Sequence, residues 1–316
     1  MINLAKEIIN GRRLKRGEDL SFFLSKDSKE LFKGANMIRK ELCGNKVDLC
    51  TIINGRSGGC SENCKFCAQS THYHTGIKKY GFLDPDIILE HLKKIQVNKI
   101  PRFCIVTAGR SVTGKDFDKA IESYKKIHKE YDINLCASFG LLTEDQFIKL
   151  KEAGVSMCHS NIETSKRNFP NICTTHTYED KINNIKLIKK AGLKVCSGGI
   201  IGIGETWEDR IDMALSLSEL QVDSIPINAL KPIKGTPYEN LKPLSKDDIL
   251  RKIAIFRYIN PTAYIRMAAG RNYFEDGGTS LFMSGCNATI TGDMLTTVGN
   301  NTTQDKKMLT NLGFDI

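Results

Sequence analysis

Three cysteines stand close together in the first quarter of the chain, on a segment rich in glycine. Cys60, Cys64 and Cys67 fall within eight residues. Thiolates are soft ligands that suit iron–sulfur clusters and zinc. Three of them on one short loop can converge on a single metal centre and still leave one position of a four-ligand set open. The spacing therefore predicts a metal centre that can also bind a small molecule.

A structural zinc site is the alternative reading of this segment. Such sites take four protein ligands, usually from paired Cys-x-x-Cys units. No fourth cysteine or histidine follows at zinc-finger spacing, although His72 and His74 are near enough to keep the zinc alternative open.

A second set of cysteines lies within predicted strands, namely Cys104, Cys136 and Cys196. A single cysteine in an apolar strand is usually a small buried hydrophobe. In a barrel, however, alternate residues of every strand face one lumen, so three such cysteines can meet. They are again one ligand short of four, and spacing alone leaves the fourth open among Cys50, Arg266 and others.

Short β-branched runs alternate with helical patterns along most of the chain. The predicted strands are 47–53, 102–107, 133–139, 155–161, 194–201, 224–228, 263–267 and 288–290. The predicted helices between them are 87–95, 115–129, 143–153, 180–191, 207–220 and 246–259. Such alternation predicts parallel strands in a barrel or an open doubly wound sheet.

The count of about eight strands favours the barrel. We therefore predict an α/β fold, a TIM-type (β/α)8 barrel with an N-terminal helical cap and a short C-terminal tail. The predicted organisation is a helical extension over residues 1–45, a barrel over 46–299 and a tail over 300–316 that contains one short helix.

Composition restricts the class of protein further. The 316 residues carry 46 basic and 36 acidic side chains, a formal net charge of +10. The lysines are scattered along helical faces, which is typical of a solvated surface more than of a nucleic-acid site. No apolar stretch suits a membrane span and no secretory signal is evident, so we expect a cytoplasmic protein that binds neither membrane nor nucleic acid. Eleven cysteines in that compartment indicate metal ligation or catalysis.

The motif Cys-x3-Cys-x2-Cys, with Phe66 just before its last cysteine, resembles the radical S-adenosylmethionine (SAM) enzymes. The surrounding residues resemble the biotin synthase family in particular, over roughly 46–312. The resemblance implies that Cys60, Cys64 and Cys67 hold a [4Fe-4S] cluster. It also implies that SAM binds the open iron through its amino and carboxylate groups, with Phe66 against the adenine.

The same resemblance implies a [2Fe-2S] cluster held by Cys104, Cys136, Cys196 and Arg266. Arginine is an unusual ligand, because a protonated guanidinium has donors and no acceptor. The alternative role of Arg266 is that of a counter-ion for the thiolates. The remaining cysteines have no matching metal position and are expected to be structural, although Cys50 lies where it can perturb this cluster; they are Cys43, Cys50, Cys158, Cys173 and Cys286.

By resemblance, Asn161 and Glu163 contact the SAM ribose, with Glu163 in place of a common aspartate. Lys181 stands where an arginine often meets the SAM carboxylate. On the substrate side, Asn228 matches a residue bonded to the ureido ring of dethiobiotin. Thr296 and Thr297 match residues near the dethiobiotin carboxylate, and His159 replaces an asparagine found in many members of the family.

The implied activity is insertion of sulfur into dethiobiotin to form biotin. The C–H bonds involved are too strong and too weakly acidic for acid–base catalysis, so a 5′-deoxyadenosyl radical generated from SAM is expected, and no catalytic acid or base is assigned. The resemblance also implies an electron donor of the flavodoxin or ferredoxin type and a homodimer. Two alternatives stay open: another radical SAM barrel enzyme, such as one that thiolates tRNA, and a non-enzymatic iron–sulfur carrier.

Overall fold

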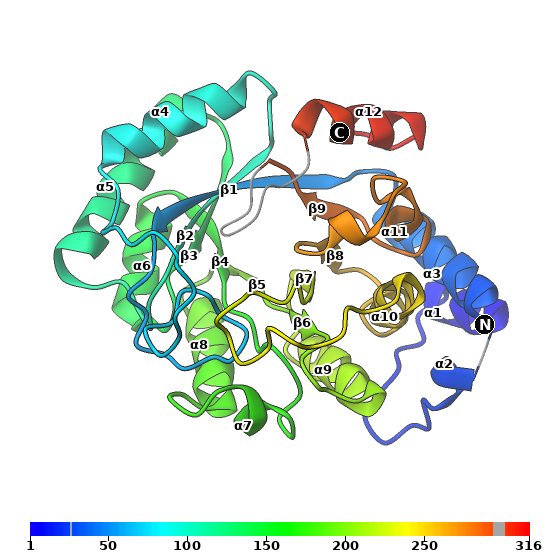
Figure 1. The fold of residues 1–316 in the computed structure, drawn as a ribbon. Coiled ribbons are helices and arrows are strands. Elements are labelled where there is room, and N and C mark those ends of the chain that lie inside the picture. The colour runs from blue at the N-terminus through cyan, green and yellow to red at the C-terminus, as the bar shows by residue number, and fades with distance from the viewer. Residues whose placement is uncertain (26, 293–300) are drawn as a thin grey trace.

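The computed structural model describes residues 1–25, 27–292 and 301–316, so the predicted residues Thr296 and Thr297 lie outside the described ranges. Its centre is one closed parallel sheet seen end-on in Figure 1. The strands are β1 (Asp48–Arg56), β2 (Arg102–Thr107), β3 (Asn134–Ser138), β4 (Val155–His159), β5 (Lys194–Cys196), β6 (Gly199–Ile201), β7 (Ser224–Ala229), β8 (Tyr264–Met267) and β9 (Ala288–Ile290). β5 pairs with both β4 and β7, and this pairing closes the sheet.

β5 and β6 are two halves of one barrel strand, because they are separated by two residues and both pair with β7. Counting them as one gives the eight parallel strands of a TIM-type barrel, which confirms the predicted fold class. The sequence pattern predicted one unbroken strand over 194–201, and this prediction was wrong at Ser197 and Gly198. There the Gly198 N–H donates to the side-chain Oδ1 of Asn161 at 3.0 Å, so a side chain replaces the ladder partner.

Helices surround the barrel and follow most strands. They are α4 (Pro85–Gln96), α5 (Gly114–Glu130), α6 (Glu144–Glu152), α7 (Phe169–Ile172), α8 (Tyr178–Lys190), α9 (Trp207–Glu219), α10 (Lys246–Ile259) and α11 (Thr279–Met283), with a short 3-10 turn, η1, at Arg271–Tyr273. Three of the longer helices begin with a capping box, in which the N-cap threonine and the residue three positions later bond each other's backbone N–H: α6 at Thr143, α8 at Thr177 and α9 at Thr206. These local signals explain why the predicted helix starts match closely.

The terminal helices pack on the outside of the barrel. They are α1 (Ile2–Ile9), α2 (Phe22–Ser25) and α3 (Ser28–Cys43) at the N-terminus and α12 (Thr302–Asn311) at the C-terminus. α3 lies against α10 and α1, at the right of Figure 1. The Lys306 ammonium on α12 donates to the Asn98 carbonyl at 2.8 Å, which ties the C-terminal helix to the loop after α4. Within the described ranges, no helix combines the length and the apolar character that crossing a bilayer demands.

One buried cation in α10 is not compensated by a hydrogen bond. The Lys252 side chain is 1% exposed, and its Nζ has no hydrogen-bond partner within the described residues. The Phe256 ring centroid lies 4.8 Å from Nζ, and the charge of Glu205 also favours the ammonium. Burial outweighs these contributions and lowers the pKa of Lys252 well below its ordinary value. A buried ammonium without a hydrogen bond costs stability.

We therefore expect the substitution Lys252→Met to raise the free energy of unfolding at pH 7 by about 1–3 kcal/mol. The pKa is lower in the folded state, so the unfolded chain binds the proton more tightly and the wild type gains stability as pH rises. The advantage of the variant should shrink as the pH approaches 10.5, the ordinary lysine value. Urea unfolding at several pH values measures this difference. Lys246→Met is the control, since Lys246 is exposed beside Glu275; a Lys252→Met protein less stable than wild type would contradict the expectation.

Candidate functional site

The three closely spaced cysteines lie on the loop that follows β1, at the carboxyl end of the barrel where barrel active sites gather. Backbone hydrogen bonds fold this loop on itself. The Cys60 N–H donates to the Gln69 carbonyl at 3.0 Å, and the Cys67 N–H donates to the Cys64 carbonyl at 3.0 Å. Cys60 is buried, and Cys64 and Cys67 are half-buried. The backbone of the loop is thus folded without help from a ligand.

The electrostatics of these thiols suit a cationic centre. Burial, together with the neighbouring Cys60 and Glu163, raises the pKa of Cys67 to about 11. The hydrogen bond to Cys173, followed by burial, raises the pKa of Cys64. Thiols that oppose one another's ionisation become thiolates readily when a metal supplies positive charge. The donor set therefore fits a three-cysteine iron–sulfur cluster.

A second sulfur group lies inside the barrel. Cys50, Cys104, Cys136 and Met157 form one buried cluster, and Cys196 packs against it. Cys104 stands beside Cys136 in the register of β2 and β3. Burial raises the pKa of Cys104 well above its ordinary value, and Cys136, Cys50 and Cys196 add to that effect. The three predicted cysteines are thus brought together, and Cys50 joins them.

Arg266 reaches the same region from β8. Its Nη1 donates to the carbonyls of Asp48, at 3.1 Å, and Thr289, at 3.0 Å, and its Nη2 donates to the Asp48 carboxylate. Burial lowers the pKa of Arg266, but the Asp48 charge and the thiols of Cys50 and Cys196 more than offset it, so the net shift is upward. In the structure the guanidinium is therefore a charged donor, which is the geometry of a counter-ion.

Asp48 joins Arg266 to a second arginine. Arg102 Nε donates to the Asp48 carboxylate at 2.9 Å, and Arg102 Nη1 donates to Cys136 Sγ at 3.4 Å. Burial raises the pKa of Asp48, but the two guanidinium groups outweigh it and the net shift is downward. One carboxylate therefore compensates two cations directly beneath the sulfur group.

A single cavity of about 390 Å³ connects the two sulfur groups. Phe66 and Cys67 line it from the loop, and the second group lines it from the strands. The lining residues that matter here are Phe66, Cys67, Cys50, Cys104, Cys136, Cys196, Arg266, His159, Asn161, Glu163 and Asn228. A molecule held in this cavity would lie between the loop cysteine and the strand cysteines.

Asn161 and Glu163 follow β4 and form one unit. Asn161 Nδ2 donates to the Glu163 carboxylate at 3.2 Å, while Asn161 Oδ1 accepts from Gly198. Glu163 has a φ of +67°, a left-handed conformation that is uncommon outside glycine. Burial raises the pKa of Glu163, although Lys181 opposes the shift. Lys181 lies half-buried on α8, outside the cavity lining, and its charge acts on two residues of the lining, Glu163 and His159.

Asn228 and His159 line the cavity wall. Asn228 links β6 to the residues after β8, since its Nδ2 donates to the Gly199 carbonyl at 3.3 Å and its Oδ1 accepts from the Ala269 N–H at 3.2 Å. Burial, with the charges of Lys181 and Arg266, lowers the pKa of His159 to about 4. His159 is therefore neutral near pH 7.

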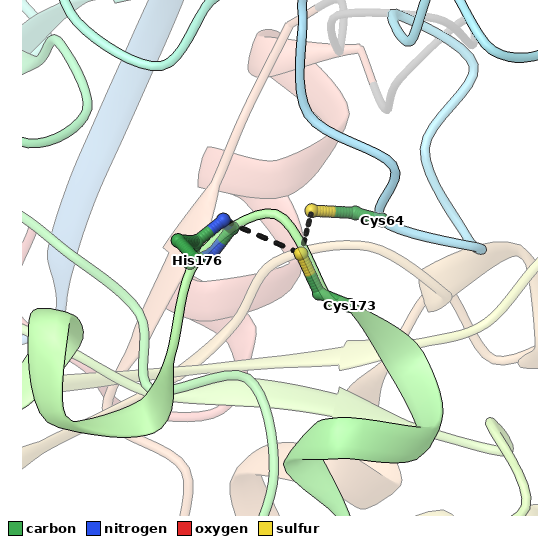
Figure 2. A group of neighbouring side chains, drawn as sticks. All are labelled: Cys64, Cys173 and His176. Atoms are coloured by element: carbon green, nitrogen blue, oxygen red, sulfur yellow. Dashed lines mark hydrogen bonds between the residues drawn. The ribbon is translucent and has the colours of Figure 1, made fainter.

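The sequence interpretation missed one group at the loop. Cys173 was expected to be structural, but its Sγ lies 3.6 Å from Cys64 Sγ and 3.3 Å from His176 Nδ1 (Figure 2). The Cys-x-x-His spacing of Cys173 and His176 is the sequence signal that could have indicated this group. The family resemblance assigned no role to either residue. His72 and His74 are exposed. Among the described residues, the histidine that joins a metal-ready group is His176.

Family models match most of the chain. The model of the radical SAM superfamily matches residues 56–217, and that of the biotin and thiamin synthesis associated domain matches 226–315. Among solved structures, methylornithine synthase superimposes with a TM-score of 0.86 at 20% identity, covering 99% of this chain and 96% of the other. A maturase of the [FeFe]-hydrogenase gives a TM-score of 0.80 at 15% identity, over 99% of this chain and 74% of the other. These two likenesses concern the fold alone.

The barrel and its cysteine loop define the class: this chain is a radical SAM enzyme. It is 71% identical to a biotin synthase of Clostridium beijerinckii over all of both chains. It is 64% identical to a biotin synthase of Alkaliphilus metalliredigens, over 99% of this chain and 98% of the relative. The chain therefore belongs to the biotin synthase family.

The Asp48 bridge gives a stability prediction. Asp48→Asn leaves the guanidinium groups of Arg102 and Arg266 without their buried counter-charge, and we expect it to lower the free energy of unfolding by about 3–5 kcal/mol. Asp86→Asn is the matched control, because Asp86 pairs with Lys126 on the surface and should matter by less than about 1 kcal/mol. Denaturant unfolding of the two cluster-free variants makes the comparison. Equal stability of the two would argue against a compensating role for Asp48.

Proposed function

We propose that this chain inserts sulfur between two unactivated carbons of dethiobiotin and so forms biotin. The observation that carries the proposal is the single cavity with Cys67 at the loop and Cys104, Cys136 and Cys196 in the strands. A substrate bound there lies between two sulfur-rich groups. One group can serve to generate a radical while the other supplies the sulfur atom.

We propose that Cys60, Cys64 and Cys67 hold a [4Fe-4S] cluster, which when bound supplies the electron that cleaves SAM. Phe66 lines the cavity beside Cys67 and offers an apolar face for the adenine. Asn161 and Glu163 offer an amide and a carboxylate to the ribose, and Gly198 keeps Asn161 in place. Lys181 adds positive charge near this unit, where the SAM carboxylate is proposed to lie.

We propose that Cys104, Cys136, Cys196 and Arg266 hold a [2Fe-2S] cluster, which when bound supplies the sulfur. The residues fit this role because three thiols and a cation line one cavity. Arg266 and Arg102 place positive charge beside the sulfur group, and this favours thiolate and sulfide. In this proposal Arg266 is a ligand of the cluster. Its contacts with Asp48 and Thr289 are those of the chain without the cluster.

The cavity wall is proposed to bind and shield the substrate. Asn228 would bond the ureido ring, and Thr296 and Thr297 would bind the carboxylate. His159 is neutral near pH 7, so it can bond the substrate without adding charge. The closed barrel keeps water and stray hydrogen donors away from a radical, while the cofactors carry the chemistry.

The remaining expectations belong to the same proposal. The described chain has eleven free cysteines, which suits a reducing cytoplasm. We propose an electron donor of the flavodoxin or ferredoxin type and a homodimer, both on family grounds. We also propose that residues 1–45 form an extension to a barrel over 46–299, with a tail over 300–316.

Two variants test the division of labour between the sulfur groups. In anaerobic assays with SAM, reductant and dethiobiotin, Cys60→Ala should abolish 5′-deoxyadenosine formation, because SAM cleavage requires the loop cluster. Cys136→Ala should retain part of that cleavage while biotin formation falls below detection. Cys158→Ala is the matched control, since Cys158 is buried in β4 outside both groups and should keep both products. Mössbauer spectra should show two cluster types in wild type and one in Cys136→Ala.

The outcomes separate the alternatives. Equal loss of both products in a folded Cys136→Ala protein would refute the assignment of separate roles. 5′-Deoxyadenosine without biotin in the reconstituted wild type would indicate a different radical SAM reaction, and absence of both products would indicate an iron–sulfur carrier.

A further inference from the structure

Cys173 and His176 stand beside the cysteine loop and have no part in the proposed reaction. Cys173 follows α7, and His176 precedes α8. Both side chains are buried, with 3% and 7% exposure. Together with Cys64, they present two sulfur atoms and one ring nitrogen that lie within 4.8 Å of one another. Figure 2 shows the three side chains pointing toward one another.

The separations of these atoms suit a single ion. A tetrahedral zinc site has metal–sulfur bonds of about 2.3 Å and metal–nitrogen bonds of about 2.0 Å, which place its ligand atoms roughly 3.5–3.8 Å apart. Cys64 Sγ and Cys173 Sγ are 3.6 Å apart, and Cys173 Sγ and His176 Nδ1 are 3.3 Å apart. The third separation, from Cys64 Sγ to His176, is within 4.8 Å, so the three donors are close enough to bind one zinc-type cation.

A buried carboxylate contacts the histidine of the group. The Glu62 carboxylate contacts His176 Nδ1, and it also accepts from Thr175 Oγ1 at 2.7 Å and from Arg110 Nη1 at 3.3 Å. Glu62 is buried and is not one of the three residues whose donor atoms all lie within 4.8 Å of one another, so it acts as a partner that holds the His176 ring. Two thiolates and one imidazole give three protein ligands and leave the fourth position to water.

The two segments that supply these donors are fastened together. The Lys65 N–H donates to the Ile172 carbonyl at 2.9 Å. Asn63 Oδ1 accepts from the Thr174 N–H at 2.9 Å and from Cys173 Sγ at 3.4 Å. The ligand atoms are therefore brought together by the fold, which lowers the cost of binding an ion.

We propose that the cluster-free chain binds one thiophilic divalent cation, of the Zn²⁺ type, through Cys64, Cys173 and His176, with Glu62 as the partner that holds His176. Binding releases the thiol protons of Cys64 and Cys173 to the solvent, and no electron moves. Cys64 also belongs to the loop triad, so this ion and a three-cysteine cluster exclude each other. The competition, but not the ion binding, rests on the function proposed above.

The test uses the full-length chain, stripped of metal under anaerobic conditions. Co²⁺ serves as the optical probe, and Zn²⁺ then displaces it in competition with a chromophoric chelator. We expect one equivalent of Co²⁺ with thiolate charge-transfer bands. Outer-sphere partners of a metal contribute roughly 10–100-fold to affinity. Loss of a direct ligand in Cys173→Ala or His176→Ala should therefore weaken Zn²⁺ binding at least about 100-fold.

The controls use cysteines that only one of the two sites needs. Cys60→Ala and Cys67→Ala should keep the wild-type Zn²⁺ affinity and lose the cluster after reconstitution with iron and sulfide. Cys173→Ala should form the cluster, and one equivalent of Zn²⁺ should not slow its formation as it does in wild type. Cys173→Ser, which keeps the size of the side chain, and circular dichroism of each variant guard against misfolding.

Two results would overturn the proposal. One is a wild-type chain that binds neither Co²⁺ nor Zn²⁺. The other is a loss of Zn²⁺ affinity in Cys60→Ala or Cys67→Ala equal to that in Cys173→Ala, which would assign the ion to the loop triad. Failure of the proposed reaction has a different signature, because it leaves Zn²⁺ binding intact and appears as missing biotin.

Discussion

Closure of the parallel barrel is the constraint on which this structure depends. Once β5 pairs with both β4 and β7, the sheet is closed, and alternate residues of every strand point into one lumen. Barrel interiors are usually filled by bulky branched side chains. Here cysteines, two arginines, an asparagine and a histidine from the strands line the lumen, and a cavity of about 390 Å³ remains. The barrel interior is thus a cavity lined by chemically reactive side chains.

Burying charged side chains in this cavity costs electrostatic free energy, and nearby opposite charges offset part of that cost. Arg102 and Arg266 share the Asp48 carboxylate, which leaves an excess of positive charge beneath the cysteines. Buried thiols resist ionisation, as the raised pKa values of Cys104 and Cys196 show. The nearby guanidinium groups lower that resistance, so the same charges that need Asp48 for stability favour a thiolate-ligated centre.

The open end of the barrel is organised by loops. Hydrogen bonds join the cysteine loop to the end of α7 and the segment after it. The Lys65 N–H donates to the Ile172 carbonyl, and Asn63 Oδ1 accepts from the Thr174 N–H. This attachment brings Cys173 next to Cys64. Cys64 is therefore a member of two possible ligand sets. The state of the chain before cluster assembly depends on which set Cys64 joins.

The sequence by itself predicted the strand and helix pattern from β-branched runs and helical periodicity, and the loop triad from its close spacing. It singled out Cys104, Cys136 and Cys196 by their place in predicted strands. All of these are local properties of the chain. Tertiary structure decided the rest. The break in the strand after Cys196 depends on the Asn161 side chain, which follows β4. The Asp48 carboxylate joins β1 to β2 and β8. Cys173 contacts Cys64, which is 109 residues away in the sequence. Such contacts are set by how distant segments pack, and no periodicity in the chain encodes them.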